Sequence, residues 1–256
     1  NGTYFGRSWL PYVGYQPALE LRDADARERF GLGPRPVLPG PRDEEALRYR
    51  DFWRDADLVH METTIGTAAD QIAITPGVLR RSWTENGRRY FRYETERPVS
   101  FGATVFSGRY EVVEDRWEDV ALSIHHHPSH TFVLDRMMQG MKAALDYFTA
   151  EFGPYPDRQL RIVEFPRYQT FAQSFPNTVP YSEGIGFIAR VKDAEEDVDY
   201  PFYVTAHEVA HQWWAHQVIG GNVQGSTVMS ETLSQYSAMM VMEEEYGRGQ
   251  IRKFLG

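Results

Sequence analysis

Apolar and polar residues alternate along much of the chain between residue 58 and residue 127. In a half-buried β-strand successive side chains point to opposite faces, so this alternation predicts strands. Turn-forming pairs such as Asn86-Gly87 separate the runs. We expect strands at Leu58–Ile65, Gln71–Ile74, Arg89–Glu94, Thr104–Phe106, Tyr110–Val113 and Val120–Ile124.

The period changes after Pro128. From Phe132 to Phe152 the apolar residues recur at helical spacing, and the run ends at Gly153-Pro154, as a helix should. Further along, the pattern predicts two short strands and two helices. These are the strands Leu160–Phe165 and Ile185–Ala189 and the helices of about Tyr200–Val218 and Thr227–Tyr246.

The order of these elements predicts an α+β protein in two portions. Residues 1–127 form a β-rich N-terminal portion, and residues 128–256 form an α/β portion. The first forty residues are rich in Gly and Pro, so we interpret them as loop with short extended pieces.

Composition narrows the possible functions. The 256 residues include 27 basic and 36 acidic side chains, giving a net charge of -9, and no Lys/Arg cluster is present that could bind phosphates. We therefore expect no nucleic-acid partner. The chain has no cysteine, so histidines and carboxylates must supply any metal ligands.

No apolar run approaches the length needed to cross a bilayer. The first residues, Asn1-Gly2-Thr3-Tyr4, lack an initiator Met and a signal-peptide pattern, and Gln250–Gly256 stops within a helical run. We expect a soluble domain of a longer protein, with any membrane contact made by segments outside this chain. No feature of the sequence specifies an oligomeric state.

The candidate chemistry lies in the first late helix. His207 and His211 are four residues apart, so they rise from one helix face and can converge on one metal ion. Glu208, beside the first ligand, can reach a metal-bound water without joining the ligands. That position suits a general base.

A third ligand is needed, because H-E-x-x-H alone recurs by chance in helices. Glu231 opens the following helix, and a helix–loop–helix return would bring it back to the pair. Two histidines and one carboxylate with an open position favour a single Zn²⁺ ion.

The segment from Val204 to Trp214 is similar to the zinc helix of the aminopeptidase N family, the gluzincins. The stretch Ser230–Tyr236 resembles the membrane-associated bacterial branch of that family. The resemblance implies a thermolysin-like catalytic portion, one zinc ion held by His207, His211 and Glu231, and Glu208 as the base. One departure is that nineteen residues separate His211 from Glu231, one more than is usual in the family.

The same resemblance suggests a role for Glu183. The family binds the substrate's free α-amine with a glutamate in a Gly-x-Met-Glu-Asn stretch, and here only Glu183 matches, twenty-four residues before His207. A carboxylate there would pair with the ammonium group of a peptide N-terminus. The alternative is a glutamate in a surface turn.

These observations predict a zinc aminopeptidase that acts on peptides with a free N-terminus. The family's oxyanion-stabilising tyrosine lies several tens of residues beyond the third ligand, and this chain ends twenty-five residues after Glu231. Because loss of such a donor typically costs on the order of a hundredfold or more in rate, we expect low activity. The alternatives are a zinc endopeptidase and a non-catalytic zinc module of a membrane transporter assembly.

A second group of histidines, His125-His126-His127 and His130, could indicate another metal site. It lies at the end of a predicted strand, where alternate side chains point to opposite faces. We interpret it as structural.

Overall fold

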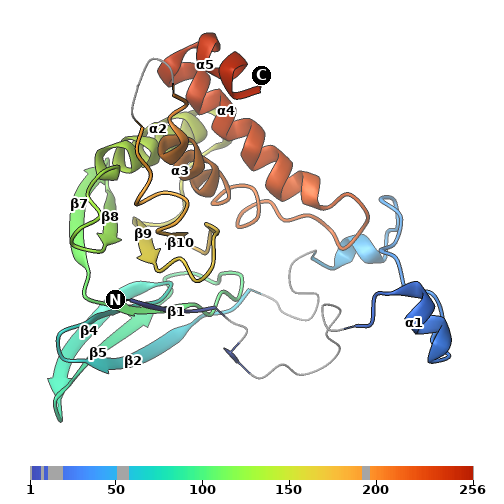
Figure 1. The fold of residues 1–256 in the computed structure, drawn as a ribbon, viewed down its shortest axis with the longest axis horizontal. Helices are drawn as coiled ribbons and strands as arrows, with labels where there is room; N and C mark the ends of the chain where they lie inside the picture. Colours follow the sequence, from blue (N-terminus) through green and yellow to red (C-terminus); the bar gives the residue numbers. More distant parts are fainter. Residues whose placement is uncertain (1, 7–8, 11–19, 51–57, 192–196, 256) are drawn as a thin grey trace.

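The computed structural model describes residues 2–6, 9–10, 20–50, 58–191 and 197–255. The chain has mixed α and β structure with a β-rich first part, which confirms the predicted α+β class. Figure 1 shows the strands of the first part at the lower left and the helices of the second part above them.

A four-stranded sheet lies at the centre of the molecule. Its strand order is β10-β9-β8-β7; β8, β9 and β10 run parallel, and β7 is antiparallel to β8. In β8 the alternate residues Val120, Leu122 and Ile124 are buried, as the sequence pattern predicts. The strands are β7 (Glu111–Trp117), β8 (Val120–His126), β9 (Gln159–Phe165) and β10 (Thr178–Ser182).

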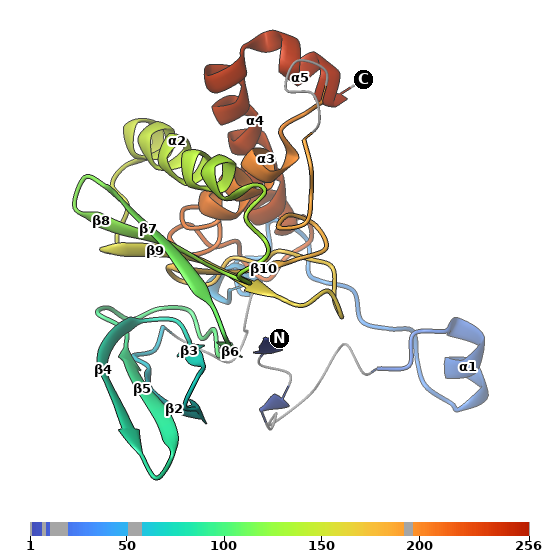
Figure 2. The same cartoon turned by 60° about the vertical axis from the view of Figure 1, so that its left-hand side comes forward.

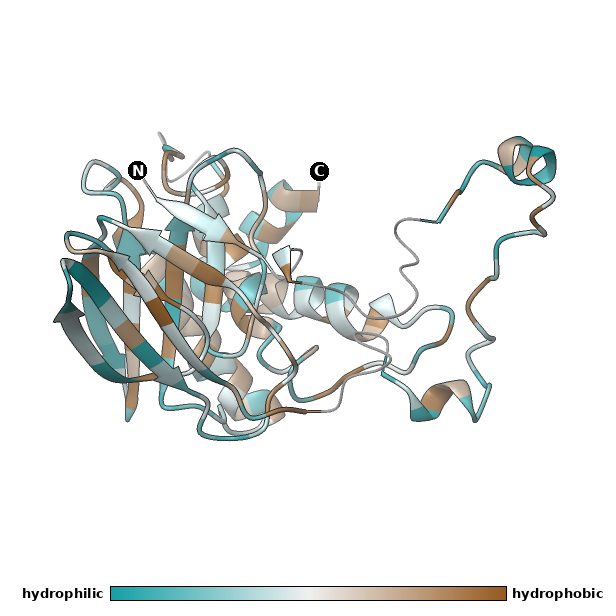
Figure 3. Ribbon diagram, turned by 90° about the horizontal axis from the view of Figure 1, so that it is seen from below, coloured by the Kyte–Doolittle hydropathy of each residue, from teal (hydrophilic) through white to brown (hydrophobic). Residues whose placement is uncertain are grey.

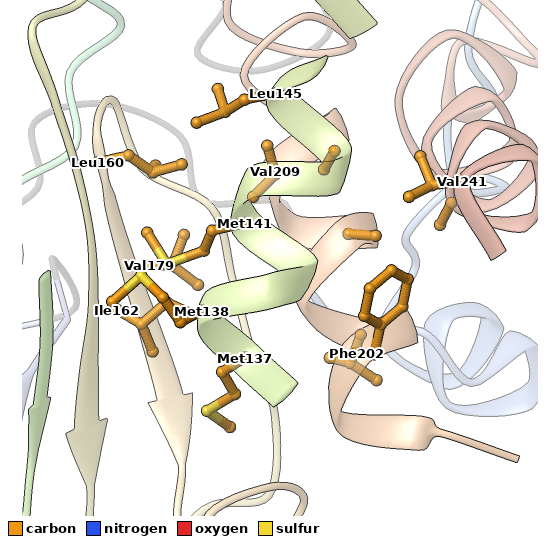
Figure 4. Close-up of a cluster of buried hydrophobic side chains, with 14 of the residues drawn as sticks. Met137, Met138, Met141, Leu145, Leu160, Ile162, Val179, Phe202, Val209 and Val241 are labelled. Atoms are coloured by element: carbon orange, nitrogen blue, oxygen red, sulfur yellow. The ribbon is translucent and has the colours of Figure 1, made fainter. Parts of the chain in front are cut away.

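Helices lie on one side of this sheet, one directly against it and the others beyond that helix (Figure 2). They are α2 (Leu134–Phe152), α3 (Tyr200–Ala210), α4 (Leu233–Tyr246) and α5 (Arg248–Leu255). Figure 4 shows α2 lying between the sheet and α3, with Leu145 facing Leu160 and Met141 next to Val179. Burial of one such side chain contributes roughly 1.5–3 kcal/mol, so these contacts hold α2 against the sheet.

Two smaller antiparallel sheets form the β-rich part. One has the order β1-β6-β3 and the other β2-β5-β4. Figure 3 shows polar and apolar segments alternating along these strands, as expected for sheets with one solvated face. The strands are β1 (Thr3–Phe5), β2 (Glu62–Ala68), β3 (Ile72–Ile74), β4 (Val78–Glu85), β5 (Arg88–Glu94) and β6 (Val105–Gly108).

Arg161 of β9 connects the central sheet to the β-rich part. Its guanidinium donates hydrogen bonds to the carbonyl oxygens of Thr75 (2.6 Å) and Gly77 (2.7 Å) and to Thr178 Oγ1 (2.9 Å). The group also lies over the ring of Tyr93, 5.2 Å from its centroid. A buried cation with this many partners fixes the two parts in one arrangement.

Two predicted elements were wrong in place or length. The strand expected at Ile185–Ala189 is a series of turns, and the chain instead forms β10 at Thr178–Ser182. The helix expected to reach Val218 ends at Ala210. Turns follow because the chain reverses at Ala215, whose φ is 136°.

Other elements were absent from the prediction. Three of the eight residues of strand β4 are charged and a fourth is an exposed serine. The strand still pairs with β5, because only one face of this sheet is buried. A six-residue helix, α1 (Ala24–Arg29), forms within the segment predicted to be loop, away from the sheets in Figures 1 and 2. The helix predicted from Thr227 begins as a π-helical turn, Val228–Thr232, before α4.

The expected division at residue 127 falls between β8 and α2, and it stays a prediction. The central sheet spans this point, since it contains β7 and β8 from one side and β9 and β10 from the other. Within the part of the chain that the structure describes, no helix is long and apolar enough to cross a bilayer.

Candidate metal centre

The local sequence fixes where helix α3 starts. Asp199 caps it, because its side chain accepts a hydrogen bond from the backbone N–H of Phe202 at 3.2 Å, and Pro201 occupies the first turn, where no N–H is needed. Asp199 also pairs with Arg136 of α2 and accepts a 3.0 Å hydrogen bond from the Tyr246 hydroxyl of α4. These contacts hold the helix start between its neighbours.

The structure brings the three predicted zinc ligands together. His207 Nε2 and His211 Nε2 are 3.2 Å apart, and Glu231 Oε2 lies 3.5 Å from the first and 3.6 Å from the second. The three atoms come from the end of α3, the residue that follows it, and the π-helical turn before α4. They form a nearly equilateral triangle.

The size of this triangle fits a tetrahedral zinc ion. For ligand bonds of about 2.0–2.1 Å, neighbouring ligand atoms of a tetrahedron lie roughly 3.3–3.4 Å apart. The observed separations of 3.2–3.6 Å bracket that spacing. The three residues therefore have the donor types and the geometry to hold Zn²⁺ with one position open.

Second contacts orient His211. Its Nδ1 lies 3.0 Å from the carbonyl oxygen of Trp214 and 3.0 Å from Ser234 Oγ of α4. A proton on Nδ1, donated to the Trp214 carbonyl, leaves the lone pair of Nε2 directed at the ligand triangle.

Glu208 faces the same cavity. Its side chain is buried, and Oε2 has no hydrogen-bond partner among the described residues. Burial raises the pKa of this carboxyl, an effect that His211 and His207 oppose and Glu231 reinforces. An unpartnered buried oxygen next to the ligands can accept a proton.

Glu231 differs from Glu208 in its surroundings. Its side chain is 55% exposed, and its contacts with His207 and His211 hold its pKa well below the ordinary value. Two carboxylates within one site are thus tuned in opposite directions, one toward the ionised form needed for a ligand and the other toward proton uptake.

A cavity of about 740 Å³, called the zinc cavity below, opens onto the ligand triangle. Sequence reasoning missed most of its wall, because the wall comes from three segments that carry no motif. These segments are the N-terminal stretch with Tyr4, Phe5 and Trp9, the loop with Phe101 and Gly102, and the loop 168–176 between β9 and β10. Each of these segments contributes at least one aromatic side chain, and the described residues of the wall include no carboxylate besides Glu208 and Glu231.

Gln212, which follows the second histidine, holds the third wall segment. Its Nε2 donates to Ser174 Oγ (2.5 Å) and to the Phe175 carbonyl oxygen (2.9 Å), while its Oε1 accepts from the backbone N–H of Asn177 (3.0 Å). The side chain is 1% exposed. The only sequence signal for this role was its position beside His211.

The structure does not bring Glu183 to the ligand triangle. It lies just past β10 in a separate cavity with His130 and Glu164. Its Oε1 accepts a 3.0 Å hydrogen bond from the backbone N–H of Arg167. The predicted role as amine anchor stays a prediction.

Known structures share this fold. The chain matches the crystal structure of the M1 zinc metallopeptidase from Deinococcus radiodurans with a TM-score of 0.56 and 18% identity, over 75% of this chain and 42% of that chain. A mutant of that enzyme matches with a TM-score of 0.56 and 17% identity over the same shares. The chain matches no protein-family model and no curated protein.

The likeness at these identities concerns the fold. The chain has the α+β architecture of an M1 peptidase and spans less than half of the length of the structures it matches.

Proposed function

We propose that this chain is the catalytic part of a zinc-dependent peptidase. The observation that carries the proposal is the triangle of His207 Nε2, His211 Nε2 and Glu231 Oε2 beside a buried, unpartnered Glu208. A structural zinc site closes its coordination with four protein ligands, whereas a catalytic site keeps one position open. Likeness in fold to M1 zinc metallopeptidases supports the same conclusion.

The residues of the site have different roles in the proposed reaction. Zinc, when bound by this triad, supplies a Lewis acid and lowers the pKa of a bound water to about 7. Glu208 accepts the proton of the attacking water and can return it to the leaving amine, and its raised pKa suits both steps. Ser234 and the Trp214 carbonyl keep His211 oriented throughout.

The finer part of the proposal is aminopeptidase specificity, in which peptides with a free N-terminus are the substrates. It rests on the resemblance of the zinc helix and on the position of Glu183 in the sequence. In this reading Glu183 pairs with the α-ammonium group and so selects the first residue of a peptide.

One observation favours an endopeptidase as the second candidate. Among the described residues that line the zinc cavity, Glu208 and Glu231 are the only carboxylates, and both have roles at the metal. A cavity of about 740 Å³ without a further carboxylate can accept the interior of a peptide as well as its end. The third candidate, a non-catalytic zinc module of a transporter assembly, does not need Glu208.

Paired peptide substrates test these candidates. The chain with one equivalent of Zn²⁺ is incubated with a peptide that has a free N-terminus and with its N-acetylated copy, and the products are identified by mass spectrometry. An aminopeptidase cleaves only the free form and releases single residues. Cleavage of both forms at an internal bond supports the endopeptidase. Because low activity is expected, the non-catalytic module is supported only if zinc binds and neither form is cleaved after long incubation at high protein concentration.

A further inference from the structure

A second group of metal-binding side chains lies apart from the zinc cavity. His130, Glu164 and Glu183 each offer one ligand atom, and these atoms lie within 4.8 Å of one another. The three residues are far apart in the sequence, and none of them lines the zinc cavity. Their meeting is a product of the fold.

The fold places this group where ligands commonly bind. His130 follows β8, Glu164 is next to the last residue of β9, and Glu183 directly follows β10. Strands β8, β9 and β10 are parallel, so the group lies at their common carboxyl edge. In α/β sheets this edge is the usual position of a binding site.

Backbone contacts leave one oxygen of each carboxylate available. Glu164 Oε2 accepts a 2.6 Å hydrogen bond from the N–H of His127, and Glu183 Oε1 accepts one of 3.0 Å from the N–H of Arg167. The opposite oxygens both face His130 Nδ1, Glu164 Oε1 in direct contact and Glu183 Oε2 at 3.9 Å. Two fixed carboxylates therefore direct one oxygen each toward the same imidazole nitrogen.

The charge of this group is largely shielded from water. The side chains of Glu164, His130 and Glu183 are 4%, 18% and 24% exposed. Two carboxylates that meet in such a place need a cation nearby. Arg109, which lines the same cavity, already pairs with Asp70 at 2.5 Å.

The group also has room for an ion with its remaining ligands. The cavity has a volume of about 270 Å³ and is lined by the three side chains together with His127, Tyr110 and Pro166. A water molecule occupies about 30 Å³ in the liquid, so a cation and several waters fit.

We propose that His130, Glu164 and Glu183 bind a second divalent cation, separate from the ion proposed at His207, His211 and Glu231. One imidazole and two carboxylate oxygens form a donor set suited to Zn²⁺ or Mn²⁺. The ion joins the ends of β8, β9 and β10, and it fixes the start of the loop whose later residues line the zinc cavity. This proposal does not depend on catalysis at the ligand triangle, but it is an alternative to the amine-anchor role of Glu183, because Glu183 Oε1 accepts from Arg167 and Oε2 faces the proposed ion.

Metal stoichiometry tests the proposal. Bound metal is removed from the chain with a chelator, and the chain is then dialysed against Zn²⁺ alone. The amount of metal bound per chain is measured by inductively coupled plasma mass spectrometry. We expect two ions in the unaltered chain, one in His130→Asn and in Glu183→Gln, one in His207→Asn, and none in the double variant His130→Asn/His207→Asn. His60→Asn, an exposed histidine outside both groups, is the control and should keep two.

The opposite results overturn it. If His130 is only an imidazolium that pairs with the two carboxylates, the unaltered chain binds one ion, and neither His130→Asn nor Glu183→Gln lowers that number. Failure of the zinc triad would look different, because His207→Asn would then leave the metal content unchanged while His130→Asn abolished it. Circular dichroism confirms the fold of each variant, and Glu183→Gln, the more exposed site, serves if His130→Asn does not fold.

Discussion

His211 and Ser234 are joined across two helices, with His211 Nδ1 3.0 Å from Ser234 Oγ. The contact helps to hold the imidazole so that its other nitrogen points at Glu231. Since α4 also follows the turn that carries Glu231, one helix positions two of the three residues of the ligand triangle.

Ser234→Ala should therefore weaken zinc binding without removing it. We expect a loss of about 10-fold in affinity, the lower end of what such orienting contacts contribute, because the Trp214 carbonyl still accepts from Nδ1. Competition with a chromogenic chelator measures the change. Ser123→Ala is the control, a half-buried serine of β8 that lies outside the cavity at the ligand triangle and contacts neither His211 nor Trp214. Equal losses in both variants would contradict the prediction.

Glu208→Gln should separate binding from catalysis. The amide has the same shape and cannot accept a proton, so we expect kcat to fall by roughly 10²–10⁴ while zinc content stays unchanged. Initial rates on the better substrate of the paired peptides, with metal analysis of the same samples, measure both quantities. Glu244→Gln, on the exposed side of α4, controls for the loss of charge. Full activity in Glu208→Gln would exclude this residue as the base.

Arg161→Met should destabilise the whole chain. The substitution leaves the carbonyl oxygen of Thr75 without its Arg161 donor, whereas the carbonyl oxygen of Gly77 keeps a 2.7 Å hydrogen bond from Gln159 Nε2. Because one buried unpaired group costs about 1–3 kcal/mol, we expect the free energy of unfolding in urea to fall by roughly 1–3 kcal/mol. The exposed Arg158→Met is the control. A change in Arg161→Met no larger than in the control would show that the contacts contribute little.

Stability should also fall as the pH drops below 6.5. Burial, helped by the charge of Arg161, lowers the pKa of His125 from 6.5 to about 3. Between pH 6.5 and about pH 3, His125 is therefore protonated in the unfolded chain and neutral in the folded chain. The contribution of neutral His125 to the free energy of unfolding is fully present above pH 6.5 and decreases as the pH falls below 6.5. The slope for one such group is about 1.4 kcal/mol per pH unit.

Urea unfolding at pH 7 and pH 5.5 measures this loss. In His125→Asn the difference between the two pH values should be smaller than in the unaltered chain, because the protonating group is gone. The exposed His60→Asn should behave like the unaltered chain. An unchanged pH dependence in His125→Asn would mean that other groups determine it.

The sequence pattern predicts correctly the elements whose apolar residues recur at a regular spacing. Helix α2 and strand β8 follow their patterns closely, because each buries one stripe or one face. Strand β10 was misplaced because it contains Pro180, a residue that argues against a strand. The strand tolerates the proline because it lies at the sheet edge, where one side needs no donor.

The grouping of His207, His211 and Glu231 could be predicted because it depends on local geometry. Four residues along a helix fix the relation of His207 to His211, and one return of the chain adds Glu231. The position of Glu183 depends instead on the path of the loop between β9 and β10, which no periodicity encodes. The meeting of Glu183 with His130 and Glu164 depends on the parallel pairing of three strands, and short-range patterns carry no information about that pairing.

Gln212 connects the cavity wall to the candidate metal centre. Its side chain holds the wall at Ser174, Phe175 and Asn177, and its backbone is bonded directly to His211. Any displacement of this wall would therefore strain hydrogen bonds of the residue next to His211, so the shape of the cavity and the position of His211 depend on the same side chain.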